Sequence, residues 1–132
     1  MSRRELREHI FKLLFRVEFN SLEDMSEQES LFFEDEDAAK DEKDTGYISD
    51  KYHKIQQKLP EIDGQLNEKT EGWDTARMSK VDLTILRLAV YEINYDDSVP
   101  TGVAINEAVL LAKKFGQDAS SGFVNGILAK FA

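Results

Sequence analysis

The residues best suited to binding chemistry lie near the N-terminus, where arginine and phenylalanine recur at helical spacing. Each residue of an α-helix advances by about 100°, so Arg4, Arg7, Phe11 and Phe15 would share one sector of its surface. Guanidinium groups bind phosphate oxygens through paired hydrogen bonds, and both guanidinium planes and aromatic rings stack on unpaired bases. These residues are therefore a candidate surface for single-stranded RNA. In the alternative interpretation, Phe11 and Phe15 widen the buried face of the helix and the arginines are ordinary solvated charges.

The residue types that catalysis and metal binding need do not occur in a useful arrangement. The sequence has no cysteine, which excludes disulfides, thiol catalysis and cysteine-based zinc sites. His9 and His53 lie in separate segments without a metal-ligand pattern, so we expect both at the surface. No nucleophile comes with a plausible base, and no glycine-rich phosphate loop precedes a helix. We therefore expect no enzyme, no cofactor, no metal ion and no small-molecule substrate.

The net charge of −9 arises from one acidic segment. Between Glu23 and Asp44 the chain has eleven acidic residues and two lysines, so the remainder is neutral overall. We expect residues 34–46 within this segment to be loop-like. The acidic side chains could compete with RNA phosphates for the N-terminal arginines or attract a basic protein. In the alternative interpretation they only keep the domain soluble.

The elements that would carry these residues are helices, because apolar residues recur at intervals of three and four and no run alternates like a strand. The first helix is expected over residues 2–17, and Ser21 looks like the cap of a second, shorter one. A third helix is expected to run through Pro60 with a kink, because its apolar register continues past the proline. That register consists of Ile48, Tyr52, Ile55, Leu59, Ile62 and Leu66.

Three further helices are expected in the C-terminal half. Ser79 and Asp82 resemble a capping box at the start of a helix that ends near Asn94. The next helix would follow Pro100 and extend to about Phe115.

Glycines and an aspartate are expected to shape the end of the chain. Gly116 suits the left-handed position after a helix, and Asp118 would cap the last helix. Gly122 and Gly126, four residues apart, would let another helix approach closely. Together these patterns predict an all-α protein of about seven helices in a single domain over residues 1–132. No secretory signal and no apolar stretch long enough to span a bilayer is visible, so we expect a cytoplasmic protein.

The most specific pattern is an ordered series of short motifs. They are Trp73–Arg77, Ser79–Asp82, Ile85–Ile93, Val99-Pro100, Val103–Val109, Lys114–Gly116 and Phe123–Gly126, together with Arg3-Arg4 and Arg7-Glu8 near the N-terminus. In their order and spacing these motifs resemble the NusB family of bacterial transcription antitermination factors. The segment from Ser21 to Asn67 resembles the family only in length and helical pattern.

The resemblance implies a fold of two packed three-helix groups and binding of the boxA element of nascent RNA. Alignment on the Arg7-Glu8 pair assigns Arg3, Arg4 and Arg7 to the arginine-rich first helix that contacts RNA in this family. Phe123 matches a family position near bound RNA, with helix packing as its alternative role. Lys113 and Lys114 could extend the basic surface or simply solvate one face of a helix.

The resemblance also implies protein partners. NusB proteins assemble on boxA RNA with NusE, a ribosomal small-subunit protein, and join the elongating RNA polymerase. Phe15 and Asp82 are the residues that we expect to contact the protein partner. The alternative is a helical adaptor between proteins that has no RNA binding of its own.

Overall fold

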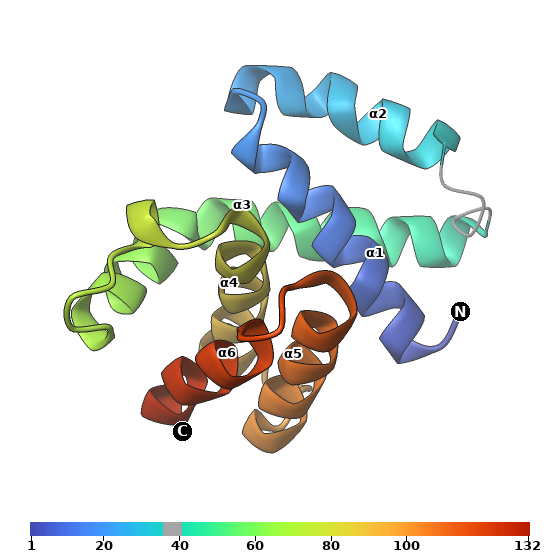
Figure 1. Ribbon diagram of the computed structural model, residues 1–132. Coiled ribbons are helices and arrows are strands. Elements are labelled where there is room, and N and C mark those ends of the chain that lie inside the picture. Colours follow the sequence, from blue (N-terminus) through green and yellow to red (C-terminus); the bar gives the residue numbers. More distant parts are fainter. Residues whose placement is uncertain (36–40) are drawn as a thin grey trace. The chain divides into compact units, whose positions relative to one another are not determined.

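The computed structural model describes residues 1–35 and 41–132, except for the side chain of Asp35, and every element in these ranges is helical. The α-helices are α1 (Arg3–Phe15), α2 (Met25–Asp35), α3 (Glu42–Lys69), α4 (Lys80–Tyr95), α5 (Thr101–Phe115) and α6 (Ser120–Leu128) (Figure 1). Short 3₁₀ segments occur at Arg16–Glu18, Leu22–Asp24, Thr75–Arg77 and Ala129–Phe131. The all-α prediction is confirmed, with six described α-helices in place of about seven.

The chain divides into two compact units, Met1–Gln56 and Gln57–Ala132. Unit 1 contains α1, α2 and the first part of α3, and unit 2 contains the rest of α3 with α4, α5 and α6. This division agrees with the two three-helix groups that the family resemblance implies, and each unit is described below by itself. The expectation of a single domain stays a prediction.

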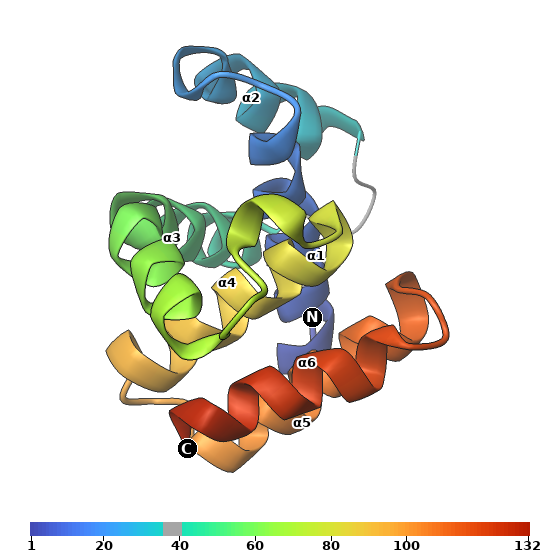
Figure 2. The same ribbon diagram turned by 60° about the vertical axis from the view of Figure 1, so that its left-hand side comes forward.

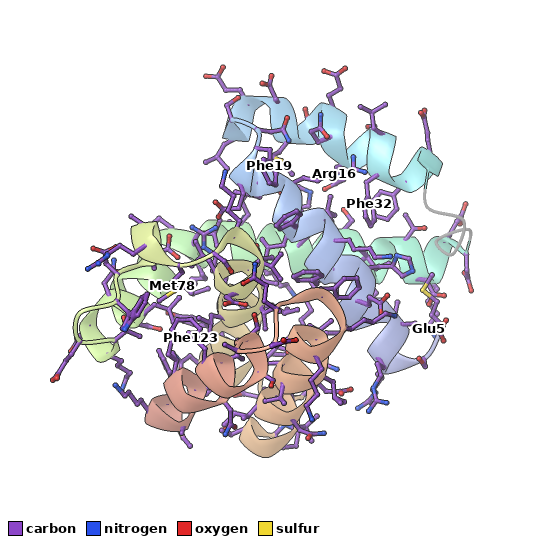
Figure 3. All side chains as sticks on the ribbon, viewed as in Figure 1. Glu5, Arg16, Phe19, Phe32, Met78 and Phe123 are labelled. Carbon is purple, nitrogen blue, oxygen red and sulfur yellow. The ribbon has the colours of Figure 1, made fainter. Side chains whose placement is uncertain are left out.

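Side-chain contacts from α2 tie the helices of unit 1 together. Arg16, just after α1, donates from Nη1 to the Gln28 carbonyl oxygen at 3.2 Å, and its guanidinium lies 5.2 Å from the Phe32 ring centroid (Figure 3). Further along α2, the Glu29 carboxylate accepts a hydrogen bond of 3.2 Å from Ser49 and lies 2.8 Å from Nε2 of His53, both on α3. The arginine therefore fastens α2 to α1, and the carboxylate fastens it to α3.

Two expectations for unit 1 are wrong. His9 was expected at the surface but is buried, with its ring centroid 6.3 Å from that of Phe32, whereas His53 is exposed as expected. Residues 34–46 were expected to be loop-like, but α2 extends to Asp35 and α3 begins at Glu42. Acidic side chains near a helix N-terminus interact favourably with the helix dipole, which accounts for helix at Glu42 and beyond. Residues 36–40 of that acidic segment lie outside the described residues.

The long helix α3 is continuous across Pro60, as the apolar register predicts. All six residues of that register are buried. In unit 2, Arg87 of α4 donates from Nε and Nη2 to the two carboxylate oxygens of Asp63 on α3, at 2.9 and 2.8 Å. Such paired, charge-assisted hydrogen bonds fix both distance and orientation. They hold α4 against the second part of α3.

The joint between α5 and α6 depends on Gly116, for a reason other than the one predicted. Its φ of −91° and ψ of −167° are extended, so the expected left-handed conformation is wrong. A Cβ at Gly116 would lie 2.5 Å from the Ser120 side chain and 2.7 Å from the Ala112 carbonyl oxygen, so only glycine fits. The two helices lie side by side in both views (Figure 2).

Two other expectations for this region are also wrong. Asp118 does not cap α6, whose N-cap residue is Ala119 without a side-chain hydrogen bond. The Ser120 hydroxyl instead accepts a hydrogen bond of 3.0 Å from the backbone of Gln117. Gly122 and Gly126 face open space, so no helix approaches them closely.

Candidate nucleic-acid interface

Arg3 and Arg4 form the first turn of α1, and both side chains are exposed. The turn is held by a capping box, because the Ser2 hydroxyl accepts from the Glu5 N–H and Glu5 Oε1 accepts from the Ser2 N–H, each at 3.1 Å. The hydrogen bond from the Ser2 backbone lowers the pKa of the Glu5 carboxyl. Glu5 therefore stabilises the helix start that presents the arginines, although its charge weakens their positive field.

The rest of the predicted N-terminal surface is more buried than the sequence suggests. Arg7 is only 8% exposed, and Phe11 is also buried. Phe15 is half-buried between Phe11 and Phe19, with ring-centroid distances of 6.2 and 5.0 Å. Phe19 at the end of this series is 59% exposed. For Phe11 the alternative interpretation holds, and the open part of the predicted RNA surface in unit 1 is the arginine pair Arg3 and Arg4.

The other predicted RNA contacts belong to unit 2. Lys113 and Lys114 are exposed in the last turn of α5, where cations interact favourably with the helix dipole. Phe123 lies on α6 and is half-buried (Figure 3). Its ring meets that of Trp73 in an edge-to-face contact with centroids 5.8 Å apart. Phe123 thus has the packing role that was its alternative, but its partner is a ring at the surface.

Two residues that the sequence patterns did not indicate lie beside Phe123. Trp73 is 53% exposed, and the Arg77 guanidinium lies 5.9 Å from the centroid of its ring. Both belong to the motif Trp73–Arg77, which supported the resemblance but received no binding role. The available signal was a tryptophan and an arginine four residues apart in a short polar segment between two helices.

Of the two predicted protein contacts, Asp82 has the clearer structural signature. Its backbone N–H donates to the Ser79 hydroxyl at 3.1 Å, so Ser79 caps α4 as predicted. The carboxylate atom Oδ1 is buried and has no hydrogen-bond partner among the described residues. An unsatisfied buried acceptor is unfavourable, so this atom lowers the stability of the start of α4. The other predicted contact, Phe15, lies in unit 1.

The described part of the chain contains neither a metal-binding cluster nor a membrane-spanning helix. Within residues 1–35 and 41–132 no group of three or more histidine, aspartate or glutamate side chains is arranged to hold a metal ion. None of the helices in these ranges combines the length and apolar character that crossing a membrane requires.

Comparison with known proteins identifies the family. The sequence profile described as the NusB family matches residues 4–132. The chain is 51% identical to the transcription antitermination protein NusB of Agathobacter rectalis over 132 residues, which is the full length of both proteins. The chain belongs to the NusB family. This is a family of transcription antitermination factors.

Solved structures agree with the fold. The structure superposes on T. maritima NusB with a TM-score of 0.87 at 36% identity, covering all of this chain and 91% of the other. A chain in the crystal structure of a plectonemic RNA supercoil matches with a TM-score of 0.82 at 24% identity, covering 98% of this chain and 92% of that one. At this lower identity the likeness concerns the fold alone.

Proposed function

We propose that this protein binds boxA-type single-stranded RNA together with NusE and, as part of the elongating RNA polymerase complex in the cytoplasm, suppresses premature termination. The observation that carries the proposal is the match to the NusB family along residues 4–132. The structural neighbour found with an RNA supercoil lends further support to an RNA partner.

The proposed RNA-binding residues are those predicted from the sequence. Arg3 and Arg4 are exposed at the capped start of α1, and guanidinium groups there suit backbone phosphates. Lys113 and Lys114 add a second pair of exposed cations, and Phe123 adds an aromatic ring. Arg7 remains in the proposed set, with only a small part of its side chain open to RNA.

NusE would supply the affinity that this chain lacks. A protein with a net charge of −9 attracts phosphates weakly, and a basic ribosomal partner would both complement that charge and add RNA contacts. Asp82, at the capped start of α4, would contact the partner. Phe15 would contribute apolar contact through the aromatic series that ends at the exposed Phe19.

Sequence preference tests this function. Fluorescence anisotropy would compare a labelled boxA-like strand with a scrambled strand of the same composition, in the presence of NusE. A mismatched base typically costs about 1–3 kcal/mol in sequence-specific nucleic-acid recognition, so we expect the scrambled strand to bind at least about tenfold more weakly. Equal binding of the two strands would contradict the proposal.

The second candidate function is an adaptor that binds proteins without RNA binding of its own. The burial of Arg7 and the net negative charge favour it, because both reduce the exposed positive charge. Replacing Arg3 and Arg4 with alanine separates the two functions. If the protein is an adaptor, the variant should bind NusE as tightly as the parent chain, and the RNA affinity of the complex should not change. If the protein binds RNA, that RNA affinity should fall.

A further inference from the structure

Trp73 is the only tryptophan of the chain, and it is one of the most exposed large side chains in the described residues. It lies between the end of α3 and the 3₁₀ segment Thr75–Arg77. Single exposed apolar residues are common, so exposure alone gives no reason to infer a site. The backbone and the neighbours of Trp73 give that reason.

The turn that carries Trp73 is fixed on both sides. The Trp73 N–H donates to the Thr70 carbonyl oxygen at 2.9 Å, and the buried Thr70 hydroxyl donates to the Trp73 carbonyl oxygen in return. Between them, Gly72 has a φ of +79°, a conformation that side-chain-bearing residues rarely adopt. Beyond them, the Thr75 N–H donates to Asn67 Oδ1 at 2.8 Å. The indole is therefore exposed on a backbone held in one conformation, which lowers the entropy cost of binding to it.

The neighbours of the indole are an aromatic ring and a guanidinium group. Phe123 contacts it at an interplanar angle of 70°, so the two rings support each other without stacking face to face. Arg77 lies over the ring and donates from Nη1 to the Gly72 carbonyl oxygen at 3.3 Å. Arg77 is exposed, and a guanidinium group has five N–H donors, so it can bind a further acceptor.

The charges in this part of unit 2 are mixed. Lys69 and Lys130 each donate to the other's carbonyl oxygen, at 3.2 and 3.1 Å, which fastens the 3₁₀ segment Ala129–Phe131 to the end of α3. Glu71 and Asp74 are exposed on the turn itself. Cations and carboxylates therefore nearly balance, and a ligand of this surface would be bound by ring stacking more than by net charge.

We propose that Trp73, Phe123 and Arg77, here called the Trp73 cluster, form a stacking site for one unpaired base of single-stranded RNA. The base stacks on the open indole, Phe123 supports the ring, and Arg77 binds the adjoining phosphate. This inference rests on the proposed RNA-binding function and names a subsite of it. The cluster includes Phe123, which belongs to the proposed RNA surface. Any of the four bases can stack on the indole, because every base has a π-face.

The single tryptophan provides a direct test, because its fluorescence reports on this site alone. Titrating the protein with a boxA-like single strand should quench Trp73 emission in parallel with the anisotropy of a labelled strand. Trp73→Leu should weaken binding roughly 5- to 140-fold, the range expected for losing one base–aromatic stack. Trp73→Phe should retain most of the affinity, because it keeps an aromatic face.

Tyr47 offers a matched control in unit 1. It is exposed, and the Lys51 ammonium lies 5.9 Å from its ring centroid, so it combines a ring and a cation as Trp73 does. Tyr47→Leu should leave RNA affinity unchanged. Thermal melting should show that Trp73→Leu folds like the parent chain, since the indole is largely exposed.

The outcomes separate this inference from the proposed function. RNA binding without quenching, with Trp73→Leu as tight as the parent chain, would overturn the stacking site and leave the proposed function intact. A loss of NusE binding in Trp73→Leu, with RNA affinity unchanged, would assign the surface to a protein partner and also overturn it. An absence of RNA binding with and without NusE would overturn both.

Discussion

The start of α1 and the Trp73 cluster would bind RNA through different interactions, charge attraction at the first and base stacking at the second. At the start of α1, Arg3 and Arg4 are exposed charges on a helix turn that needs only its Ser2 and Glu5 cap. In the Trp73 cluster, an indole is held by a pinned turn and by Phe123 from a distant part of the sequence. Phosphate contacts are sequence-independent and weaken with salt, whereas stacking depends little on salt. Under these proposals one protein would combine a charged region that attracts RNA with a rigid aromatic region that holds a base.

The two regions also differ in how they depend on the fold. The arginines require a single helix start, so damage elsewhere should leave them in place. The Trp73 cluster requires both the turn after α3 and the position of α6. A substitution that disturbs the start of α1 should therefore affect the arginines alone, and a substitution that displaces α6 should affect the Trp73 cluster alone.

The largest effect on stability is expected for Gly116→Ala, at the joint between α5 and α6. A Cβ there would lie 2.5 Å from the Ser120 side chain, so α6 must shift. Overpacking of this kind costs about 1–3 kcal/mol, measurable as a loss in the free energy of unfolding in urea. We expect Trp73 quenching by RNA to weaken as well, because α6 carries Phe123.

Gly122→Ala is the matched control on α6. Its Cβ would meet nothing within 4 Å, and alanine favours helix over glycine by about 0.5–1 kcal/mol. This variant should therefore be as stable as the parent chain or more so. If both glycine variants lose the same stability, the close contact at Gly116 is not what selects glycine there.

The next effect concerns the charged region, in the double variant Arg3→Ala and Arg4→Ala. Losing two phosphate contacts should weaken RNA binding about tenfold at moderate salt. It should also flatten the dependence of log K on log salt by about 0.7 per contact on a single strand. Trp73→Leu, in contrast, should keep the salt slope of the parent chain. An unchanged slope in the arginine variant would make these residues ordinary solvated charges.

A smaller effect is expected for Ser2→Ala, which removes the cap beneath the arginines. Loss of an N-cap serine typically costs about 1 kcal/mol. Because the pKa of Glu5 is lowered from its model-compound value of 4.5, its contribution to stability is present above that pH and lost as the pH falls through the lower folded value. Ser2→Ala keeps the backbone N–H that is the main cause of this lowered pKa, so most of the fall in stability below pH 4.5 should persist in the variant, measured by thermal melting across acid pH.

The smallest effect at neutral pH is expected for Tyr52→Phe, in the interior of unit 1. Burial, reinforced by the negative charge of Glu29, raises the pKa of Tyr52 from 10.0 to about 12. Its hydroxyl is buried and has no hydrogen-bond partner in the described structure, so the variant loses no hydrogen bond and should be as stable as the parent chain or more stable.

Alkaline pH should separate Tyr52→Phe from the parent chain. The folded state favours the neutral phenol, so the parent chain keeps this stabilisation below pH 10.0 and loses it as the pH rises toward 12, while the variant lacks that loss. Ultraviolet titration of tyrosine ionisation should show that the late-titrating phenol of Tyr52 in the parent chain is lost in the variant. Identical titration curves would contradict this account.

The sequence predicted the parts of the fold that depend on periodicity. The buried register of α3 continues through Pro60, and the Ser79 cap follows an equally local rule. Rules about special positions were less successful. Gly116 is required by a neighbour from the next helix rather than by its own φ, and Asp118 was assigned a cap that α6 does not use.

The part of the candidate site that consists of charged residues on one helix could be predicted from the sequence. Arg3 and Arg4 are exposed on the predicted helix, but the burial of Arg7 depends on neighbours that periodicity does not specify. Trp73 and Phe123 come together only through the folded turn after α3 and the packing of α6. Residues so far apart in the sequence form no local pattern, so their contact could not be predicted from periodicity or spacing.

The most direct test of the central claim is the affinity for a boxA-like single strand measured by anisotropy with and without NusE. Exposed positive charge on this chain is limited, so the account predicts weak binding alone and substantially tighter binding when NusE is added. The same titration with the Arg3→Ala and Arg4→Ala double variant should reduce the affinity in both conditions. An RNA affinity of the complex that equals that of NusE alone would contradict the claim and identify this chain as a protein adaptor.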